Sequence, residues 1–570
     1  MRRLDRCRRA QSIGPGRCAR DISGREIGCI RAQRRGLVSA SRRPRETRAT
    51  DSRARKGRHA SLVSRRYSTG VCERSRGSFI HRRLQRRPKD FAVSRPQRGR
   101  GFGPGLVARY SKRIAFIRTP ASREAFAFGP KRAAQPWSLR IADAETGAGR
   151  QIWKAQEGVG SSFWPVVADD QLLWGDDDRL IFPWEREGWL HLYAASTRDR
   201  SVNGKATLLT PGKFEIEHVA LSPDRKMVLF SSNQGDIDRR HIWKVPVAGG
   251  PPAAVTSGAG IEWSPVMTDD GRTVVLRSTA RVPAEAAVLD ASNPRPLVPL
   301  SGFPSQAMVA PEPVILTSAD GMRIHGQVFL PPNSGSNVKH PAVIFFHGGS
   351  RRQMLLGWHY MFYYHQAYAF NQYLASQGYI VLSVNYRSGI GYGLDFREAR
   401  NYGATGASEY NDVIGAGLYL RGRADVDPAR IGLWGGSYGG YLTALGLARA
   451  SDLFAAGVDL HGVHDWNSEI GIFAPGYDPE KQRDAAKVAF DSSPMAFVKT
   501  WRSPVLLIQG DDDRNVNFSQ SVMLAEELRK RNVPFEQLVF PDEIHDFLVH
   551  EHWLAAYRAA DKFLAKYLTK

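Results

Sequence analysis

The stretch Arg430-Ile-Gly-Leu-Trp-Gly-Gly-Ser-Tyr-Gly-Gly440 decides the fold. It has the pattern of a short apolar strand, a glycine-rich turn and the start of a helix. The turn contains G-x-S-x-G, with Ser437 at its centre. Such a turn is so sharp that its flanking positions have no room for a Cβ, and the serine hydroxyl projects from the edge of the sheet. The stretch therefore predicts a nucleophilic Ser437 between a strand and a helix.

Apolar runs on both sides of this stretch predict further strands. They cover residues 342–346, 379–384 and 504–508, and helix-like segments at residues 370–377 and 441–450 lie between strands. Strands that alternate with helices are typical of a mostly parallel sheet with helices on both faces. We therefore expect residues 311–570 to form a doubly wound α/β domain.

A serine hydroxyl needs a base, and that base needs a carboxylate to orient it. Asp511, Asp512 and Asp513 follow the strand at 504–508, and His545 follows a strand-like run at 536–540. Side chains that follow parallel strands meet at one edge of the sheet. The residues predict a catalytic set of Ser437, His545 and one of the three aspartates, and they leave the choice of aspartate open.

Residues 105–310 have a different pattern, with short β-type runs between turns. Three similar segments begin at Asp178, Asp224 and Asp270, so the repeat is 46 residues long. A period of this length with several strands per unit predicts the blades of a β-propeller, about four of them in this stretch. A generic all-β sandwich is the alternative.

The net charge of +24 comes from one end of the chain. Residues 1–100 hold 29 Arg and 2 Lys against 7 acidic residues, whereas the remaining 470 residues hold 49 of each sign. The first part is too charged to bury a core, so we expect residues 1–104 to be disordered. A basic tail that binds nucleic acid, an organelle leader and a non-native segment from a wrong start or reading frame are the three explanations.

The basic segment stands where further blades would be expected, which favours an incomplete propeller. All four cysteines, Cys7, Cys18, Cys29 and Cys72, lie in it, so the rest of the chain has no disulfide framework. No apolar run reaches 18 residues, which argues against a membrane span. We expect a cytoplasmic protein, or a secreted or periplasmic one if the true N-terminus is missing.

With these motifs the chain resembles the prolyl oligopeptidase family of serine peptidases, which includes the dipeptidyl peptidase IV and acylaminoacyl-peptidase branches. The resemblance rests on the turn around Ser437, on Gly510-Asp-Asp-Asp-Arg-Asn-Val516 and on Pro541-Asp-Glu-Ile-His545. It implies a propeller followed by an α/β-hydrolase domain. It also selects Asp513 as the acid, because in the family the acid stands three residues after the glycine of this loop.

The resemblance also implies an oxyanion hole and a substrate pocket. The backbone N–H groups of Tyr438 and Gly349 are the expected oxyanion donors. His347 takes the place where dipeptidyl peptidase IV-type members carry a tyrosine hydroxyl, with a packed loop residue as the alternative. The expected apolar pocket for the substrate side chain consists of Tyr438, Val463, Trp466 and Val516. For the two valines, core packing is the alternative.

Two departures weaken the exopeptidase interpretation. Glu469 and Phe473 stand where dipeptidyl peptidase IV-type members carry tyrosines. Glu185 and Glu187 could replace the paired glutamates that grip a substrate's free N-terminus in that branch, but Arg186 separates them. An aminopeptidase, an acylaminoacyl-peptidase-like enzyme and an endopeptidase for short oligopeptides remain open.

Two further features have competing interpretations. His545, His550 and His552 lack the HExxH spacing of a zinc site, so we predict no metal and no cofactor. The aromatic segment at residues 358–370 could stack on single-stranded nucleic acid. We favour packing or a domain interface, because the segment lies in the charge-balanced part of the chain.

The sequence thus predicts a serine peptidase that cleaves short peptides through an acyl-enzyme, with a propeller that gates access. A carboxylesterase with the same catalytic residues is the alternative, and nucleic-acid binding through residues 1–100 is the non-enzyme alternative. A short peptide is the expected partner. Assembly into a homo-oligomer is left open.

Overall fold

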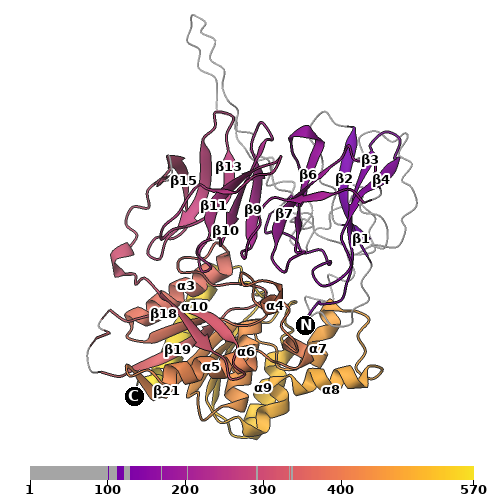
Figure 1. Cartoon of the computed structure of the whole chain (residues 1–570). Coiled ribbons are helices and arrows are strands. Elements are labelled where there is room, and N and C mark those ends of the chain that lie inside the picture. Colours follow the sequence, from indigo (N-terminus) through magenta and orange to yellow (C-terminus); the bar gives the residue numbers. More distant parts are fainter. Residues whose placement is uncertain are drawn as a thin grey trace, which may run out of the picture. The chain divides into compact units, whose positions relative to one another are not determined.

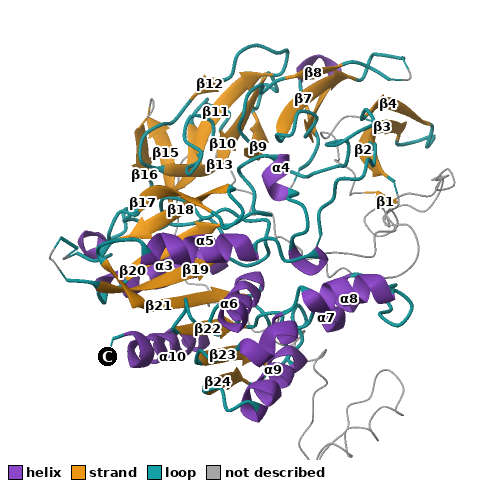
Figure 2. Cartoon of the chain, turned by 60° about the horizontal axis from the view of Figure 1, so that its bottom comes forward, coloured by secondary structure: helices purple, strands orange, loops and turns teal. Residues whose placement is uncertain are grey.

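Two kinds of sheet make up the chain in the computed structural model (Figures 1 and 2). The structure describes residues 100–101, 112–120 and 129–569, except residues 169, 202, 291–292, 333 and 336–337. The predicted disorder of residues 1–104 therefore falls outside the described residues, apart from residues 100–101. No described helix has both the length and the apolar character that crossing a membrane requires.

The first part of the described chain is all-β and consists of four antiparallel sheets of four strands each. Each sheet is a meander, with its strands side by side in chain order. Four sheets agree with the number that the repeat of 46 residues predicts, and they confirm the propeller-type domain. The strands are β1 (Arg100–Gly101), β2 (Arg113–Thr119), β3 (Ser138–Asp143) and β4 (Gly149–Lys154); β5 (Leu173–Trp174), β6 (Arg179–Trp184), β7 (His191–Ser196) and β8 (Ala206–Leu208); β9 (Ile216–Leu221), β10 (Met227–Ser232), β11 (His241–Pro246) and β12 (Ala253–Ala254); and β13 (Ile261–Met267), β14 (Thr273–Ser278), β15 (Glu285–Asp290) and β16 (Asn293–Pro296).

Neighbouring blades bury the sheet faces between them. Along β6, Leu180 and Phe182 pack with residues of the first blade, whereas Ile181 packs with residues of the third blade. Alternate side chains of a strand point to opposite faces, so this pattern is the one that a sheet with two neighbours requires. The sandwich alternative is wrong, because the described strands of this part form four separate sheets.

The second part is built on one eight-stranded sheet in the order β17-β18-β20-β19-β21-β22-β23-β24. From β20 to β24 all neighbouring strands are parallel, and only β17 and β18 pair antiparallel. The mostly parallel sheet is thus confirmed, and β17, β18 and β22 are additional to the predicted strands. The strands are β17 (Glu312–Thr317), β18 (Arg323–Phe329), β19 (His340–Phe346), β20 (Ile380–Asn385), β21 (Val426–Gly436), β22 (Ala456–Leu460), β23 (Val505–Gly510) and β24 (Phe535–Phe540).

Helices cover both faces of this sheet (Figure 2). Val343 and Phe345 of β19 pack against α3 (Phe362–Ser376) and α10 (His550–Leu568) on one face. Ile344 and Phe346 pack on the other face, against a layer that contains α5, α6 and α9. The remaining bounds are α4 (Leu394–Arg397), α5 (Tyr410–Arg421), α6 (Tyr438–Arg449), α7 (Trp466–Phe473), α8 (Arg483–Asp491) and α9 (Ser519–Lys530), with 3₁₀ turns at Asp176–Asp178, Ser305–Ala307, Gly403–Thr405 and Pro494–Thr500.

Most aromatic side chains of the segment at residues 358–370 are buried, whereas Phe362 is 60% exposed. The segment leads into α3, which begins at Phe362, eight residues before the predicted start. Ser278 of β14 donates its hydroxyl to the carbonyl of Trp358 (2.7 Å), and the Tyr368 hydroxyl donates to the carbonyl of Ala280 (2.7 Å). The segment therefore joins the fourth blade to the α/β part, which confirms the interface interpretation over the nucleic-acid surface.

Buried ion pairs also connect the two parts. Arg397 of α4 pairs with Glu185 of the second blade, with Nη2 and Oε2 2.6 Å apart, and both side chains are almost fully buried. The Arg397 guanidinium lies 3.8 Å from the ring centroid of Trp164. Glu215 of the all-β part accepts the backbone N–H groups of Gly391 (3.0 Å) and Gly393 (3.1 Å). One guanidinium and two backbone N–H groups of the α/β part thus give these two buried glutamates polar partners.

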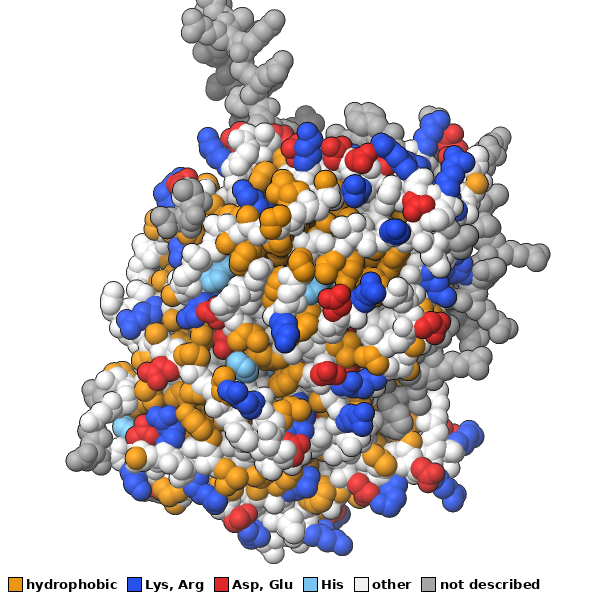
Figure 3. Space-filling view, viewed as in Figure 1, with side chains coloured by type: hydrophobic (Ala, Val, Ile, Leu, Met, Phe, Trp, Pro, Cys, Tyr) orange, Lys and Arg blue, Asp and Glu red, His pale blue; other side chains and the backbone are white. Residues whose placement is uncertain are grey.

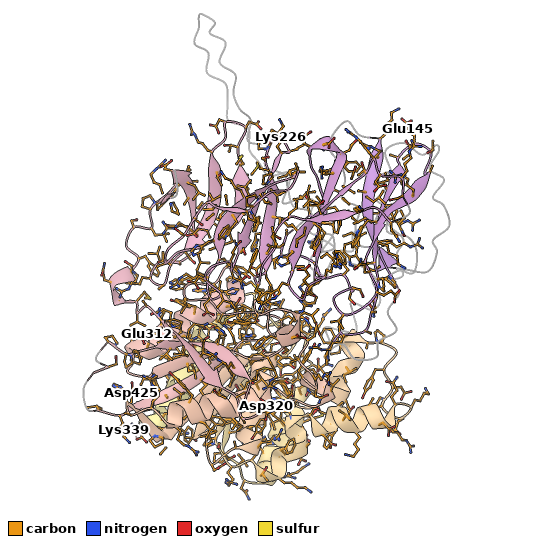
Figure 4. All side chains as sticks on the ribbon, in the orientation of Figure 1. Glu145, Lys226, Glu312, Asp320, Lys339 and Asp425 are labelled. Carbon is orange, nitrogen blue, oxygen red and sulfur yellow. The ribbon has the colours of Figure 1, made fainter. Side chains whose placement is uncertain are left out.

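Within the α/β part, Arg387 joins three elements. It pairs with Asp412 of α5 (2.7 Å) and with Asp320 (2.6 Å), which lies in the turn between β17 and β18 and is labelled in Figure 4. The Arg387 guanidinium holds the pKa of Asp320 far below its ordinary value. These contacts fix the antiparallel edge of the sheet to the helix layer.

We expect Arg397→Met to lower the free energy of unfolding by about 3–5 kcal/mol, because it leaves Glu185 buried without its partner. Denaturant unfolding measures the loss. Lys481→Met, which breaks the exposed Lys481–Asp478 pair (2.6 Å), is the matched control and should cost less than about 1 kcal/mol. Equal losses in the two variants would contradict a structural role for the buried pair.

The buried carboxyl of Glu409 makes a second prediction about stability. It accepts the Tyr438 hydroxyl (2.5 Å) and the Gly403 N–H (2.9 Å), and its burial raises the pKa of Glu409 to about 7. The folded protein then binds more protons than the unfolded chain between about pH 4.5 and 7. This group therefore makes the fold less stable as the pH rises through that window.

Glu409→Gln removes this titration. The free energy of unfolding should therefore decrease less between pH 5 and 8 in the variant than in the native protein, by up to about 3 kcal/mol. Denaturant melts at pH 5, 6, 7 and 8 test this expectation. Glu551→Gln, at an exposed position of α10, is the control and should keep the native pH dependence. Parallel curves for Glu409→Gln and the native protein would show that Glu409 does not titrate in this range.

Candidate active site

Ser437 stands in a strained turn between β21 and α6. Its backbone has φ 59° and ψ −120°, and its side chain is half-buried. A Cβ on Gly439 would lie 2.0 Å from the carbonyl oxygen of Phe346, and one on Gly435 would lie 2.6 Å from the same oxygen. Only glycine fits at these two positions. The strand–turn–helix context that the sequence predicts for Ser437 is present.

Asp513 and His545 form a short hydrogen bond, with Oδ2 and Nδ1 2.7 Å apart. Asp513 is buried, and its Oδ1 accepts the N–H groups of Asn515 (2.9 Å) and Val516 (3.0 Å). The loop after β23 is thus folded around this carboxylate, which receives a donor on each oxygen.

The other two aspartates of this loop have different partners. Asp511 accepts the N–H of Asp542 (2.7 Å), and Asp512 forms an exposed ion pair with Arg514 (3.1 Å). Within the part of the chain that the structure describes, Asp513 is the one of the three that reaches His545. The residue that the family resemblance selects is therefore the one with the required contact.

The register of the parallel strands explains why Ser437 lies near Asp513 and His545. Gly436 at the end of β21 is opposite Leu460 of β22, Leu460 is opposite Ile508 of β23, and Gly510 is opposite Phe540 of β24. The residues that follow these four parallel strands come out at one edge of the sheet. Ser437, Asp513 and His545 all lie at that edge.

The loop after β19 lies against the turn at Ser437. A Cβ on Gly348 would lie 2.8 Å from the Gly436 carbonyl oxygen and 3.1 Å from the Ser437 Cβ. Gly349, the next residue, has φ 69°, in the region that favours glycine. Tyr438 is the first residue of α6, so its N–H has no acceptor within the helix. Both expected oxyanion donors thus belong to segments that adjoin Ser437.

His347 is fully buried and packs on an aromatic ring. Its ring centroid lies 4.3 Å from that of Tyr386 at an angle of 19°, and its Nδ1 lies 3.1 Å from the Gly348 carbonyl oxygen. Burial lowers the pKa of His347 to about 3, so the ring is neutral. These contacts favour the packed-loop interpretation of His347.

The four residues of the expected pocket, Tyr438, Val463, Trp466 and Val516, are all buried members of the large apolar core on one face of the sheet. Tyr438 and Trp466 have ring centroids 5.7 Å apart. Glu469, on the same helix as Trp466, is fully buried, and its Oε2 accepts from the Gln520 amide (2.9 Å). Burial raises the pKa of Glu469 to about 7. In the sequence, Glu469 is distinguished only as a departure from the family pattern.

The glutamates considered for gripping a substrate N-terminus are not a pair. Glu185 is buried and engaged with Arg397, whereas Glu187 is exposed in the turn after β6. A carboxylate that already compensates a buried guanidinium has no free charge to offer to an ammonium group. The two side chains do not form a clamp.

Among the described residues, one group of three side chains is close enough to share a metal ion: His461, Asp513 and His545, with ligand atoms within 4.8 Å of one another. The hydrogen bond between Asp513 and His545 already uses two of these atoms. The group therefore fits acid–base chemistry better than metal binding. His550 is exposed and His552 pairs with Glu543 (2.7 Å), so neither joins His545.

Comparison with known proteins agrees with this arrangement. The model of the prolyl oligopeptidase family matches residues 366–570, and that of the dipeptidyl peptidase IV N-terminal region matches residues 108–282. Dipeptidyl aminopeptidase BIII of Pseudoxanthomonas mexicana is 30% identical over 275 residues, which are 45% of this chain and 38% of that protein. The match thus spans less than half the length of that curated relative.

Solved structures share the fold. A puromycin-hydrolyzing peptidase of Mycobacterium tuberculosis superposes with a TM-score of 0.66 at 21% identity, over 82% of this chain and 71% of that one. The acylaminoacyl peptidase of Pyrococcus horikoshii gives a TM-score of 0.60 at 21% identity, over 83% and 72%. The two matching family models follow each other along the chain in the same order as the all-β part and the α/β part. Residues 366–570 thus match the prolyl oligopeptidase family, and residues 108–282 match the N-terminal region of dipeptidyl peptidase IV.

Proposed function

We propose that the protein is a serine peptidase that hydrolyses short peptides through an acyl-enzyme. The observation that carries the proposal is the 2.7 Å hydrogen bond between Asp513 and His545 at the sheet edge where Ser437 follows β21. A base that is oriented by a buried carboxylate, next to a serine in a strained turn, is the arrangement that acyl transfer needs.

In the first half of the reaction, the Ser437 Oγ attacks the carbonyl carbon of the scissile peptide and its proton passes to the Nε2 of His545. The carbonyl oxygen becomes an oxyanion, which the N–H groups of Tyr438 and Gly349 stabilise. Asp513 keeps the Nδ1 proton in place and stabilises the imidazolium. The C–N bond then breaks, and the leaving amine takes the proton from Nε2.

In the second half, water replaces the amine. His545 takes a proton from water as the hydroxide oxygen attacks the acyl carbon, and it returns that proton to Ser437 when the C–Oγ bond breaks. The acid product leaves and the enzyme is restored. The same steps would hydrolyse an ester, so a carboxylesterase is the alternative function. The four blades favour the peptidase, because ester hydrolysis does not require them.

Access through the all-β part belongs to the same proposal. The buried contacts of Arg397 and Glu215 hold the blades on the α/β part, which supports a substrate limited to short peptides. The nucleic-acid alternative depends on residues 1–100, which lie almost entirely outside the described residues. On the described face in Figure 3, basic and acidic side chains are interspersed, which gives no support for a polyanion site there.

Substitution of the three residues tests the mechanism. We expect Ser437→Ala to abolish hydrolysis of a peptide p-nitroanilide, and Asp513→Asn to lower kcat by roughly 10³- to 10⁴-fold, because the imidazole loses its orienting partner. Asp512→Asn, in the same loop but paired with Arg514, is the matched control and should keep near-native kcat. Hydrolysis that survives in Ser437→Ala, with native folding by circular dichroism, would exclude the proposed nucleophile.

Blocking the substrate N-terminus tests the type of peptidase. Because Glu185 is engaged with Arg397, we expect an N-acetylated tripeptide p-nitroanilide to have a kcat/KM similar to that of the free-amine compound. Glu187→Gln should leave this ratio unchanged. If a carboxylate grips the ammonium group, the free amine will instead be favoured by about a hundredfold or more.

A further inference from the structure

A second histidine lies directly behind His545. His461 follows β22 and has no exposed surface. Its ring centroid is 4.2 Å from that of His545, with 38° between the ring planes. No part of the mechanism above uses this residue. A polar ring that is fully buried against the predicted base needs an explanation.

The surroundings of His461 fix it in one orientation. Its backbone has φ 40°, and its N–H donates to the Ile508 carbonyl of β23 (2.7 Å). Its Nε2 is hydrogen-bonded to the Tyr363 hydroxyl of α3 (2.9 Å), and no described residue bonds its Nδ1. Non-glycine residues with positive φ persist only where their neighbours determine the conformation, and they cluster at functional sites.

The pair of His461 and Tyr363 also reaches the turn that carries Ser437. A Cβ on Gly436 would lie 1.8 Å from the Tyr363 hydroxyl oxygen and 3.3 Å from the Nε2 of His461. Because Gly436 directly precedes Ser437, the pair packs against the end of the strand that supplies the nucleophile. It thus contacts the segment of the nucleophile and the ring of the base.

The ring of His461 carries no charge near neutral pH. Burial, and secondly the neighbouring His545, lower the pKa of His461 well below its ordinary value. Burial also raises the pKa of Tyr363 well above its ordinary value, so the phenol keeps its proton. Asp513, from the loop after β23, contacts His545, and Asp546 is the next residue in the loop of His545.

We propose that His461 is a positioning residue for His545. Its ring supports the imidazole in the plane that the bond to Asp513 sets, and its π face stabilises the imidazolium that forms when Ser437 gives up its proton. An aromatic face within about 6 Å of a cation attracts it, and the 4.2 Å between the two rings is within that range. The inference depends on the proposed function, because it assigns His545 the role of base.

Two substitutions separate a π face from simple packing. His461→Leu removes the aromatic ring, and His461→Phe keeps a ring of similar size. Both leave the Tyr363 hydroxyl without its partner, so Tyr363→Phe is the matched control for the lost hydrogen bond. Without the aromatic ring, the imidazolium of His545 is less stable and forms only at lower pH. The acidic limb of the pH profile of kcat/KM should therefore move to lower pH in His461→Leu, by roughly 0.5–1 unit.

The rate should change in parallel. We expect kcat at pH 8 to fall about three- to tenfold in His461→Leu, and to stay near native in His461→Phe and Tyr363→Phe. An acidic limb of kcat/KM that is unmoved in His461→Leu would overturn the proposal. Equal losses of kcat and equal shifts of the acidic limb in His461→Phe and His461→Leu would also overturn it. If the leucine variant does not fold, His461→Met provides the non-aromatic variant.

Labelling with a fluorophosphonate probe, which reacts with an activated serine, distinguishes a failure of the proposed function from a failure of the role proposed for His461. A native protein that neither hydrolyses peptides nor takes up the probe at Ser437 contradicts the proposed function. A native protein that does both, with unchanged pH limbs in His461→Leu, contradicts only the role of His461. Slower labelling in His461→Leu than in His461→Phe supports it.

Discussion

The strained backbone of Ser437 is the constraint on which the α/β part depends. A non-glycine residue in this region costs on the order of 1–3 kcal/mol, so the surroundings must hold it. They do so through the hydrogen bond from the Ser437 N–H to the Leu460 carbonyl (2.8 Å) and through the close approach of the Phe346 carbonyl to Gly435 and Gly439. These contacts fix β19, β21 and β22 against one another at the point where Ser437, the loop after β19 and His461 lie close together.

Features that are coded locally could be predicted from the sequence. The glycines around Ser437, the alternation of strands and helices, and the repeat from Asp178 to Asp270 each express a short-range rule, and the sheets follow them. The choice of Asp513 is an intermediate case. Asp511, Asp512 and Asp513 follow the same strand, and only burial and the contact with His545 distinguish them, so the choice required a family resemblance.

Long-range contacts were not predictable from local patterns. Arg397 and Glu185 are 212 residues apart in the chain, and neither position has a local pattern that points to the other. The start of α3 at Phe362 was missed because its N-cap residue, Met361, makes no capping hydrogen bond. Burial of the aromatic side chains, not helix propensity, extends this helix. His461 had only a weak signal, a histidine after an apolar run, which is common in proteins.

Burial shifts the pKa of five ionisable groups near the site toward their neutral forms, and this has a consequence for catalysis. Burial lowers the pKa of His347 and His461 and raises that of Glu409, Glu469 and Tyr438. Charge in the proposed reaction therefore develops mainly on the imidazole, which Asp513 already contacts, and on the oxyanion, beside the N–H groups of Tyr438 and Gly349. Such dipoles stabilise a transition state without reorganising when it forms. A charged histidine in the place of His461 would instead repel the imidazolium, so burial of that ring preserves the basicity on which Ser437 depends.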